Sequence, residues 1–101
     1  MGQIRWTEKA GKNLQAIYEY IAKDSKTYAL RFIKSLIKAT QKLETMPSCG
    51  RAVPELEGYG FKELIHQNFR IVYRTAKNSD DIEILAVVHS AREIGKALKE
   101  E

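Results

Sequence analysis

FRIVYR, residues 69–74, has the alternating pattern of a buried β-strand but contains two arginines, Arg70 and Arg74. Successive side chains of a strand point to opposite faces, so the arginines share one face with Val72 while the remaining apolar residues share the other. Arginine keeps its charge at any ordinary pH and cannot reduce the cost of burial by losing a proton. We therefore expect Arg70 and Arg74 to line an open, basic face, turned toward water or an anionic partner.

Two further strands are predicted beside this one, at residues 61–66 and 82–89, because apolar alternation continues beyond short polar turns. The turns fall at residues 67–68 and 77–81, which are rich in Asn, Asp and Ser. Connections this short join antiparallel neighbours, so the three strands should form a meander.

Alternation also assigns each meander side chain to a face. The face expected to meet helices holds Phe69, Ile71, Tyr73, Ile82, Ile84, Ala86 and Val88. The open face is expected to hold Lys62, Leu64, His66, Arg70, Val72, Arg74, Glu83, Leu85, Val87 and His89. Glu63 falls on the helix-facing side, where an unpaired carboxylate is costly, unless a bulge, an edge position or another register moves it. The pattern identifies no partner for Glu55 or Glu63.

Two amphipathic helices are predicted before the meander. The first follows Thr7 as its N-cap and ends near Lys23, and the second follows Asp24 or Ser25 and stops at Pro47. Their apolar stripes are Ala10, Leu14, Ile17, Tyr18 and Ile21 in the first helix and Ala29, Phe32, Ile33, Leu36, Ala39, Thr40, Leu43 and Met46 in the second. The short gap between them favours an antiparallel helical hairpin.

Three shorter segments complete the expected fold. Residues 3–6 suit an edge strand, residues 47–60 form a loop rich in Gly and Pro, and residues 91–99 suit a short last helix. The order β-α-α-β-β-β-α is α+β, with the hairpin packed on one face of a small, mainly antiparallel sheet. A length of 101 residues leaves room for a single domain, residues 1–101.

Composition narrows the functional classes. The net charge of +4 and the pI near 9.2 favour an anionic partner. No apolar run approaches the roughly 18 residues that span a bilayer, and the first residues do not resemble a secretory signal, so we expect no membrane partner. The single cysteine, Cys49, cannot form an internal disulfide, which fits a reducing cytoplasm. No paired Cys and His spacing suggests zinc, and we expect neither a metal nor a cofactor.

The order of these motifs resembles the RelE/ParE superfamily of bacterial toxins, which includes plasmid stabilisation toxins of type II toxin-antitoxin modules. The resemblance spans residues 4–98 and depends on W-T-x-x-A at residues 6–10, GRAVPEL at 50–56, FRIVYR at 69–74 and IEILAVVHSARE at 82–93. It implies a small cytoplasmic toxin that forms a hetero-oligomer with a cognate antitoxin. The antitoxin's extended or helical tail would cover the working surface of the toxin.

RelE-like relatives cut mRNA on the ribosome without a metal, by attack of the 2′-hydroxyl on the neighbouring phosphate. This chemistry needs a base, cations for the charge that grows on phosphorus, and a proton for the leaving oxygen. The resemblance matches Arg70, Lys62 and Arg92 to basic residues of these enzymes. His89 is our candidate acid or base if the chain is an RNase. The chain departs from that pattern at Leu64, where a second lysine is expected, and no tyrosine follows Arg92.

ParE-like relatives instead poison DNA gyrase, need no catalytic set, and commonly close with His-x-x-Arg after the final strand. His89 and Arg92 match that ending, so we favour the ParE-like branch. The candidate surface for a target or an antitoxin is then Arg51, Arg70, Arg74, His89 and Arg92. Ribosome-dependent RNA cleavage remains the alternative, and whether the chain is an enzyme depends on that choice. A basic nucleic-acid-binding module is a third interpretation, outside the toxin class.

Overall fold

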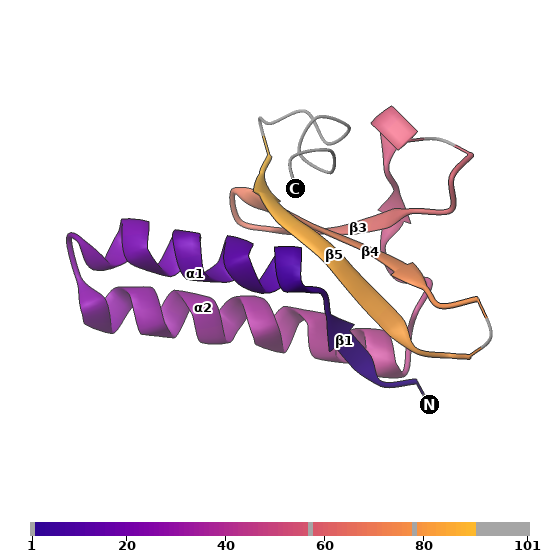
Figure 1. Cartoon of the computed structure of the whole chain (residues 1–101), viewed down its shortest axis with the longest axis horizontal. Helices are drawn as coiled ribbons and strands as arrows, with labels where there is room; N and C mark the ends of the chain where they lie inside the picture. Colours follow the sequence, from indigo (N-terminus) through magenta and orange to yellow (C-terminus); the bar gives the residue numbers. More distant parts are fainter. Residues whose placement is uncertain (1, 57, 78, 91–101) are drawn as a thin grey trace.

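Two antiparallel helices cover one face of a five-stranded sheet (Figure 1). The structure is a computed structural model that describes residues 2–56, 58–77 and 79–90. In chain order the elements are β1 (Ile4–Trp6), α1 (Glu8–Ala22), α2 (Lys26–Gln41), the 3₁₀ turn η1 (Lys42–Glu44), β2 (Arg51–Ala52), the 3₁₀ turn η2 (Pro54–Leu56), β3 (Lys62–His66), β4 (Phe69–Thr75) and β5 (Ile82–His89). The predicted α+β architecture is confirmed, and the predicted last helix lies outside the described residues.

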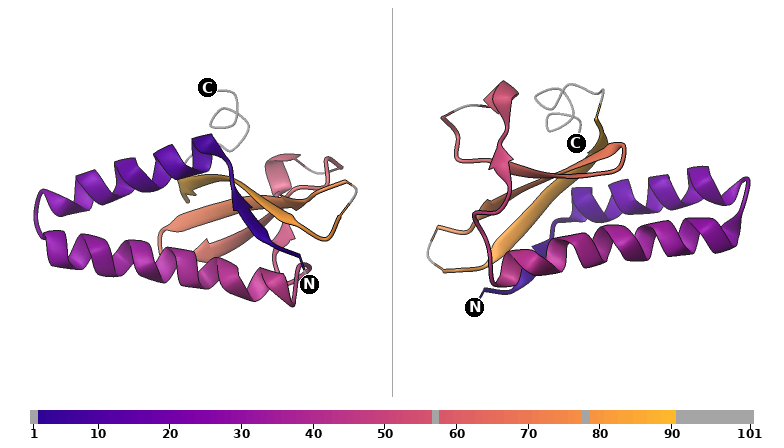
Figure 2. Two further views of the ribbon diagram at one scale, coloured as in Figure 1. Left: turned by 60° about the horizontal axis from the view of Figure 1, so that its bottom comes forward. Right: turned by 180° about the vertical axis from the view of Figure 1, so that it is seen from behind.

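The sheet has the strand order β1-β5-β4-β3-β2. β3, β4 and β5 pair antiparallel and form the predicted meander. β1 pairs with β5 in parallel and forms one edge, as the sequence predicted. At the other edge, β2 pairs with β3, so the segment predicted as a loop contributes a fifth strand. The hairpin of α1 and α2 projects beyond the strands at the end where the two helices connect (Figures 1 and 2).

Both helices begin at hydroxyl caps. The Thr7 hydroxyl accepts a hydrogen bond from the Ala10 amide at 3.2 Å, and the Ser25 hydroxyl accepts one from the Tyr28 amide at 3.1 Å. These caps satisfy amides that have no partner inside the helix. α2 ends at Gln41 and tightens into η1, so the prediction that it continues to Met46 was wrong, and Met46 is exposed. In the described part of the chain, neither helix combines the length and hydropathy that a membrane span requires.

The main core lies between the helices and the sheet. Its buried members are Ala10, Phe32, Leu36, Leu43, Leu64, Ile71, Tyr73, Ile82, Ile84 and Val87. Phe69, Ile71 and Tyr73 therefore face the helices, as alternation along FRIVYR predicted.

The predicted faces of β3 were wrong. Leu64 pairs with Ile71 and lies in the main core, and His66 reaches Ser35 of α2, so these side chains and Lys62 share the helix-facing side. Glu63 instead shares the opposite face with Arg70. The alternative register that would remove Glu63 from the helix side is the observed one, because it places the apolar Leu64 rather than the carboxylate in the core.

A β-bulge in β5 reverses the faces to which the side chains of its second half point. Val72 pairs with Ala86 while the next residue, Tyr73, pairs with Ile84, so Leu85 is an extra residue in the ladder. A bulge shifts the alternation by one position beyond it. The predicted faces were therefore wrong after Leu85. Val87 and His89 face the helices, whereas Ala86 and Val88 face away.

The sheet face away from the helices is also covered. Val53, Val72, Ala86 and Val88 form a second buried cluster, against which Leu56, Phe61 and Leu85 pack. The segment from β2 to β3 crosses this face, opposite the helical layer (Figure 2). The prediction of an open sheet face was wrong. This segment supplies apolar side chains that cover the residues of β4 and β5 that point away from the helices.

Candidate functional site

Four charged side chains form a chain of ion pairs on the face away from the helices. Arg70 donates from Nε to Glu63 Oε1 at 2.6 Å, and from Nη1 and Nη2 to the two Glu55 oxygens at 2.8 Å each. Arg51 donates from Nε to the second Glu63 oxygen at 2.6 Å. We call Arg51, Glu55, Glu63 and Arg70 the charge network. All three nitrogens of the Arg70 guanidinium take part in it.

Burial makes this pairing necessary. The side chain of Glu63 is 0% exposed and that of Arg70 is 8% exposed, whereas the Glu55 side chain is 33% exposed. An unpaired charge at either buried position would be strongly unfavourable. The hydrogen bonds that Arg70 donates to Glu55 and Glu63, together with the charges of these carboxylates, raise the pKa of Arg70 above its ordinary value despite the opposing effect of burial. Arg70 does face away from the helices, but the prediction that it lines an open surface was wrong.

The sequence contained one signal for this network. A two-residue turn at residues 67–68 pairs Ile65 with Arg70, so Glu63 becomes the diagonal neighbour of Arg70 on the same face. Glu55 could not be placed in this way, because it comes from the 3₁₀ turn η2 inside the predicted loop. Both carboxylates were left without a partner by the sequence pattern.

The other predicted site residues that the structure describes do not join this network. Arg74 donates from Nε to Glu83 Oε1 at 2.8 Å, in a pair whose side chains are 50% and 31% exposed. Lys62 lies opposite Tyr73 on the helix-facing side, half-buried. Arg92 lies outside the described residues. The fold therefore gathers Arg51, Arg70 and Arg74 on one face and separates Lys62 and His89 from them.

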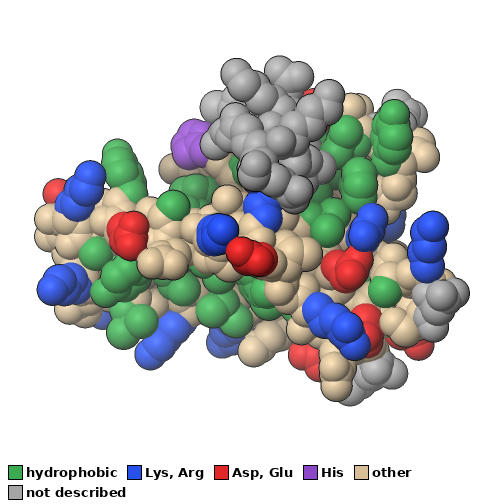
Figure 3. Space-filling view, in the orientation of Figure 1, with side chains coloured by type: hydrophobic (Ala, Val, Ile, Leu, Met, Phe, Trp, Pro, Cys, Tyr) green, Lys and Arg blue, Asp and Glu red, His purple; other side chains and the backbone are tan. Residues whose placement is uncertain are grey.

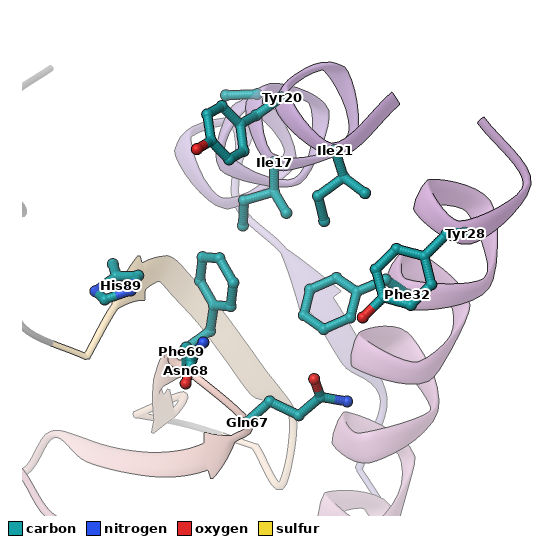
Figure 4. Close-up of a pocket in the computed structure, with 10 residues that line it drawn as sticks. Ile17, Tyr20, Ile21, Tyr28, Phe32, Gln67, Asn68, Phe69 and His89 are labelled. Carbon is teal, nitrogen blue, oxygen red and sulfur yellow. The ribbon is translucent and has the colours of Figure 1, made fainter. Parts of the chain in front are cut away.

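A groove of about 510 Å³ opens between the projecting end of the hairpin and the turn from β3 to β4 (Figure 4). Its walls are mainly apolar and aromatic, with Ile17, Ile21, Phe32 and Phe69 inside and Tyr20 and Tyr28 at the rim. His89 closes one side, with its ring edge-on to Phe69 at a centroid distance of 5.7 Å. The bulge at Leu85 places His89 here rather than beside Arg70.

Two partly buried polar clusters, around Tyr73 and around Ser35, hold the elements near these sites. The Tyr73 hydroxyl donates to the Pro47 carbonyl at 2.9 Å and accepts from the Gly50 amide at 2.9 Å, and burial raises the pKa of Tyr73. The Ser35 hydroxyl donates to the Phe32 carbonyl at 2.6 Å, so His66 Nε2, 2.9 Å from the Ser35 oxygen, is the donor in that contact. Ser35 is therefore not arranged as a nucleophile. Across residues 2–56, 58–77 and 79–90, no three His, Cys, Asp or Glu side chains gather to hold a metal ion.

The helical hairpin on a small sheet is shared with toxins of known structure. This chain is similar to the structure of a chromosomal ParDE toxin-antitoxin system from P. aeruginosa, with 25% sequence identity, a TM-score of 0.72 and coverage of 88% of this chain and 96% of that chain. The fold is also similar to that in the RelBE2 toxin-antitoxin complex from Mycobacterium tuberculosis, with 19% identity, a TM-score of 0.66 and coverage of 87% and 96%. A YoeB/ParE toxin from Agrobacterium tumefaciens shares the fold with 18% identity, a TM-score of 0.57 and coverage of 86% and 96%.

The family itself is defined by the sequence. A family model described as the ParE toxin of type II toxin-antitoxin system, parDE, matches residues 4–94. The chain therefore belongs to the ParE toxin family and is the toxin of a type II toxin-antitoxin system. A search of curated proteins gave no significant match. The resemblance to the RelE/ParE superfamily, with the ParE-like branch favoured, is confirmed.

Proposed function

We propose that this toxin inhibits growth by poisoning DNA gyrase in the cytoplasm and that a cognate antitoxin neutralises it. The state of Arg70 is the observation that supports this choice over RNA cleavage. Metal-independent cleavage needs a cation that is available to the charge growing on phosphorus. The three nitrogens of Arg70 are already bound to Glu55 and Glu63, and its side chain is only 8% exposed.

The remaining described residues of the catalytic assignment, Lys62 and His89, lie apart from Arg70. Lys62 and His89 lie on the helix-facing side of the sheet, opposite to Arg70, and His89 packs against Phe69. Leu64, at the position where RelE-like relatives are expected to carry a lysine, is buried in the main core. A base, a cation and an acid must reach one phosphate together, and these side chains are not arranged to do so. RNA cleavage is therefore our second candidate.

The antitoxin is proposed to bind in the groove between the hairpin and the sheet. Two of the similar structures are described as a toxin-antitoxin system and a toxin-antitoxin complex. In this chain the groove exposes Tyr20 to 75% and Tyr28 to 50%, above an apolar floor. Exposed aromatic side chains around an apolar cleft are typical of protein interfaces, where Tyr and Trp often carry much of the binding energy.

Two assays with purified toxin separate the candidates. In a supercoiling assay with gyrase and ATP, we expect the toxin to inhibit supercoiling. When the toxin is added to translating ribosomes, primer extension should show that the mRNA stays intact. Codon-spaced cuts with unaffected supercoiling would contradict the gyrase proposal and support RNA cleavage. The variant Lys62→Gln sharpens the comparison, because gyrase poisoning should survive it, whereas RNA cleavage assigns a catalytic role to Lys62. A neighbouring short reading frame for an antitoxin would provide the protein needed to test neutralisation.

A further inference from the structure

Helix α2 carries a charge equal to the net charge of the whole chain. Residues 26–41 contain four basic side chains, Lys26, Arg31, Lys34 and Lys38, and no acidic one. Of the seventeen basic residues in the chain, thirteen lie elsewhere, and they are matched by thirteen acidic residues. The excess of four positive charges therefore belongs to one helix. α1 differs, because Lys9 and Lys12 are matched there by Glu8 and Glu19.

Four cations lie on one face of α2 and its continuation into η1. We call Arg31, Lys34, Lys38 and Lys42 the basic stripe, and all four are exposed. Each follows by two positions a buried residue of α2, namely Ala29, Phe32, Leu36 and Thr40. Two positions turn about 200° around a helix, so the stripe points away from the sheet and spans roughly 16 Å. Figure 3 shows Lys and Arg side chains projecting along the lower edge of the molecule, where α2 runs in Figure 1.

The basic stripe does not stabilise the fold through ion pairs with other described residues. Within the described residues, none of its four members forms an ion pair, whereas Lys12 of α1 pairs with Glu8 at 3.1 Å. Like charges one helical turn apart destabilise a helix by about 0.2–0.5 kcal/mol per pair. Lys34, Lys38 and Lys42 follow one another at this spacing. A straight row of unpaired cations is the complement of a regular polyanion.

We propose that the basic stripe binds the phosphate backbone of duplex DNA without reading its sequence. Duplex DNA carries about one negative charge per 1.7 Å of its axis, so a row of roughly 16 Å lies along several phosphates at once. Lys side chains act as flexible point charges and tolerate variation in phosphate position. This inference does not depend on gyrase as the target, although gyrase acts on DNA and the stripe would bring the toxin to that substrate.

The salt dependence of binding tests the proposal. Fluorescence anisotropy with a labelled duplex of about 24 base pairs should give a micromolar Kd near 50 mM NaCl and a roughly 100-fold weaker one near 200 mM, as expected for about four phosphate contacts. The double variant Lys34→Gln/Lys38→Gln should weaken binding at low salt by about 10-fold or more and reduce the log–log salt slope by about 1.8. Gln is a good helix former at exposed positions, so circular dichroism should confirm an intact fold.

A matched control removes two charges elsewhere. Lys12→Gln/Lys77→Gln causes the same change in net charge but leaves the basic stripe intact, and its affinity should fall by less than about threefold. Equal losses in the two double variants would overturn the proposal, because net charge rather than the stripe would then explain binding. Wild-type protein that fails to bind the duplex at low salt would overturn it directly.

A second probe tests an acidic protein as the partner instead. Leu30 and Ile37 lie beside the basic stripe and are 50% and 37% exposed, a combination that an acidic amphipathic segment would also suit. Poly-glutamate with the same number of charges has a lower charge density than duplex DNA, so it should bind at least about 10-fold more weakly. Equal or tighter binding of poly-glutamate would overturn the assignment to DNA.

Discussion

Arg70 is held by two carboxylates at a buried position, so its replacement should destabilise the fold of the toxin. In Arg70→Ala, Glu63 stays buried with Arg51 as its remaining partner in the charge network. We expect the free energy of unfolding, measured by urea denaturation, to fall by about 3–5 kcal/mol. Arg74→Ala is the matched control on the same face of β4, because its pair with Glu83 is solvent-exposed and should cost at most about 1 kcal/mol. Equal small losses in both variants would show that the charge network does not stabilise the fold.

We expect Tyr73 to make the folded toxin less stable at alkaline pH. Burial raises the pKa of Tyr73 above its ordinary value of 10.0, so at high pH the unfolded chain loses this proton before the folded chain does. The contribution of the protonated Tyr73 hydroxyl to the free energy of unfolding is therefore complete below pH 10 and falls as the pH rises above that value. Tyr73→Phe should cost about 1–3 kcal/mol near neutral pH, because the Pro47 carbonyl and the Gly50 amide both lose a partner. The difference between the two proteins should narrow above about pH 10, and a constant difference in denaturation free energy would contradict this.

At the scale of elements, α2 offers neighbouring residues with opposite environments. Leu36 is 0% exposed against the sheet and Ile37 is 37% exposed on the outer surface. Leu36→Ala should lower the free energy of unfolding by about 2–5 kcal/mol, through lost apolar contacts and the cavity left behind. Ile37→Ala should lower the free energy of unfolding by less than about 1 kcal/mol, since this side chain is already exposed to solvent. A similar loss in both variants in chemical denaturation would mean that the apolar stripe of α2 is misassigned.

The elements also show where sequence patterns stop being informative. Both helices could be located because their apolar periodicity lasts for several turns, and the direction of Arg70 followed from alternation along β4. The faces of β3 and of the second half of β5 could not be assigned, because a strand's register and the bulge at Leu85 are set by the partner strand. The same limit applies to the prediction of the candidate site. Arg70 was found, but its partners Glu55 and Glu63 depend on how β2, η2 and β3 fold back over β4.

At the scale of the whole molecule, both sheet faces are covered, and each cover has a different character. The helices bury the larger apolar core on one face, and the β2–β3 segment buries a smaller one beside the charge network on the other. Within the described residues, two surfaces outside these covered sheet faces are candidates for binding partners. They are the groove under the projecting end of the hairpin and the basic stripe on the outside of α2. Their separation allows the toxin to bind a protein in one place and a polyanion in the other.

The groove yields the last prediction, that Tyr20→Ala weakens antitoxin binding without weakening the fold. Tyr20 stands at the groove rim and is 75% exposed, so loss of its ring opens no cavity in the core. Aromatic anchors of interfaces often contribute 2 kcal/mol or more, which corresponds to a Kd about 30-fold higher by isothermal titration calorimetry with the cognate antitoxin. Tyr59→Ala is the control, because Tyr59 is 73% exposed, stacks on Phe61 and does not line the groove. If the two variants bind antitoxin equally well, the antitoxin is anchored elsewhere, and the groove must serve another partner.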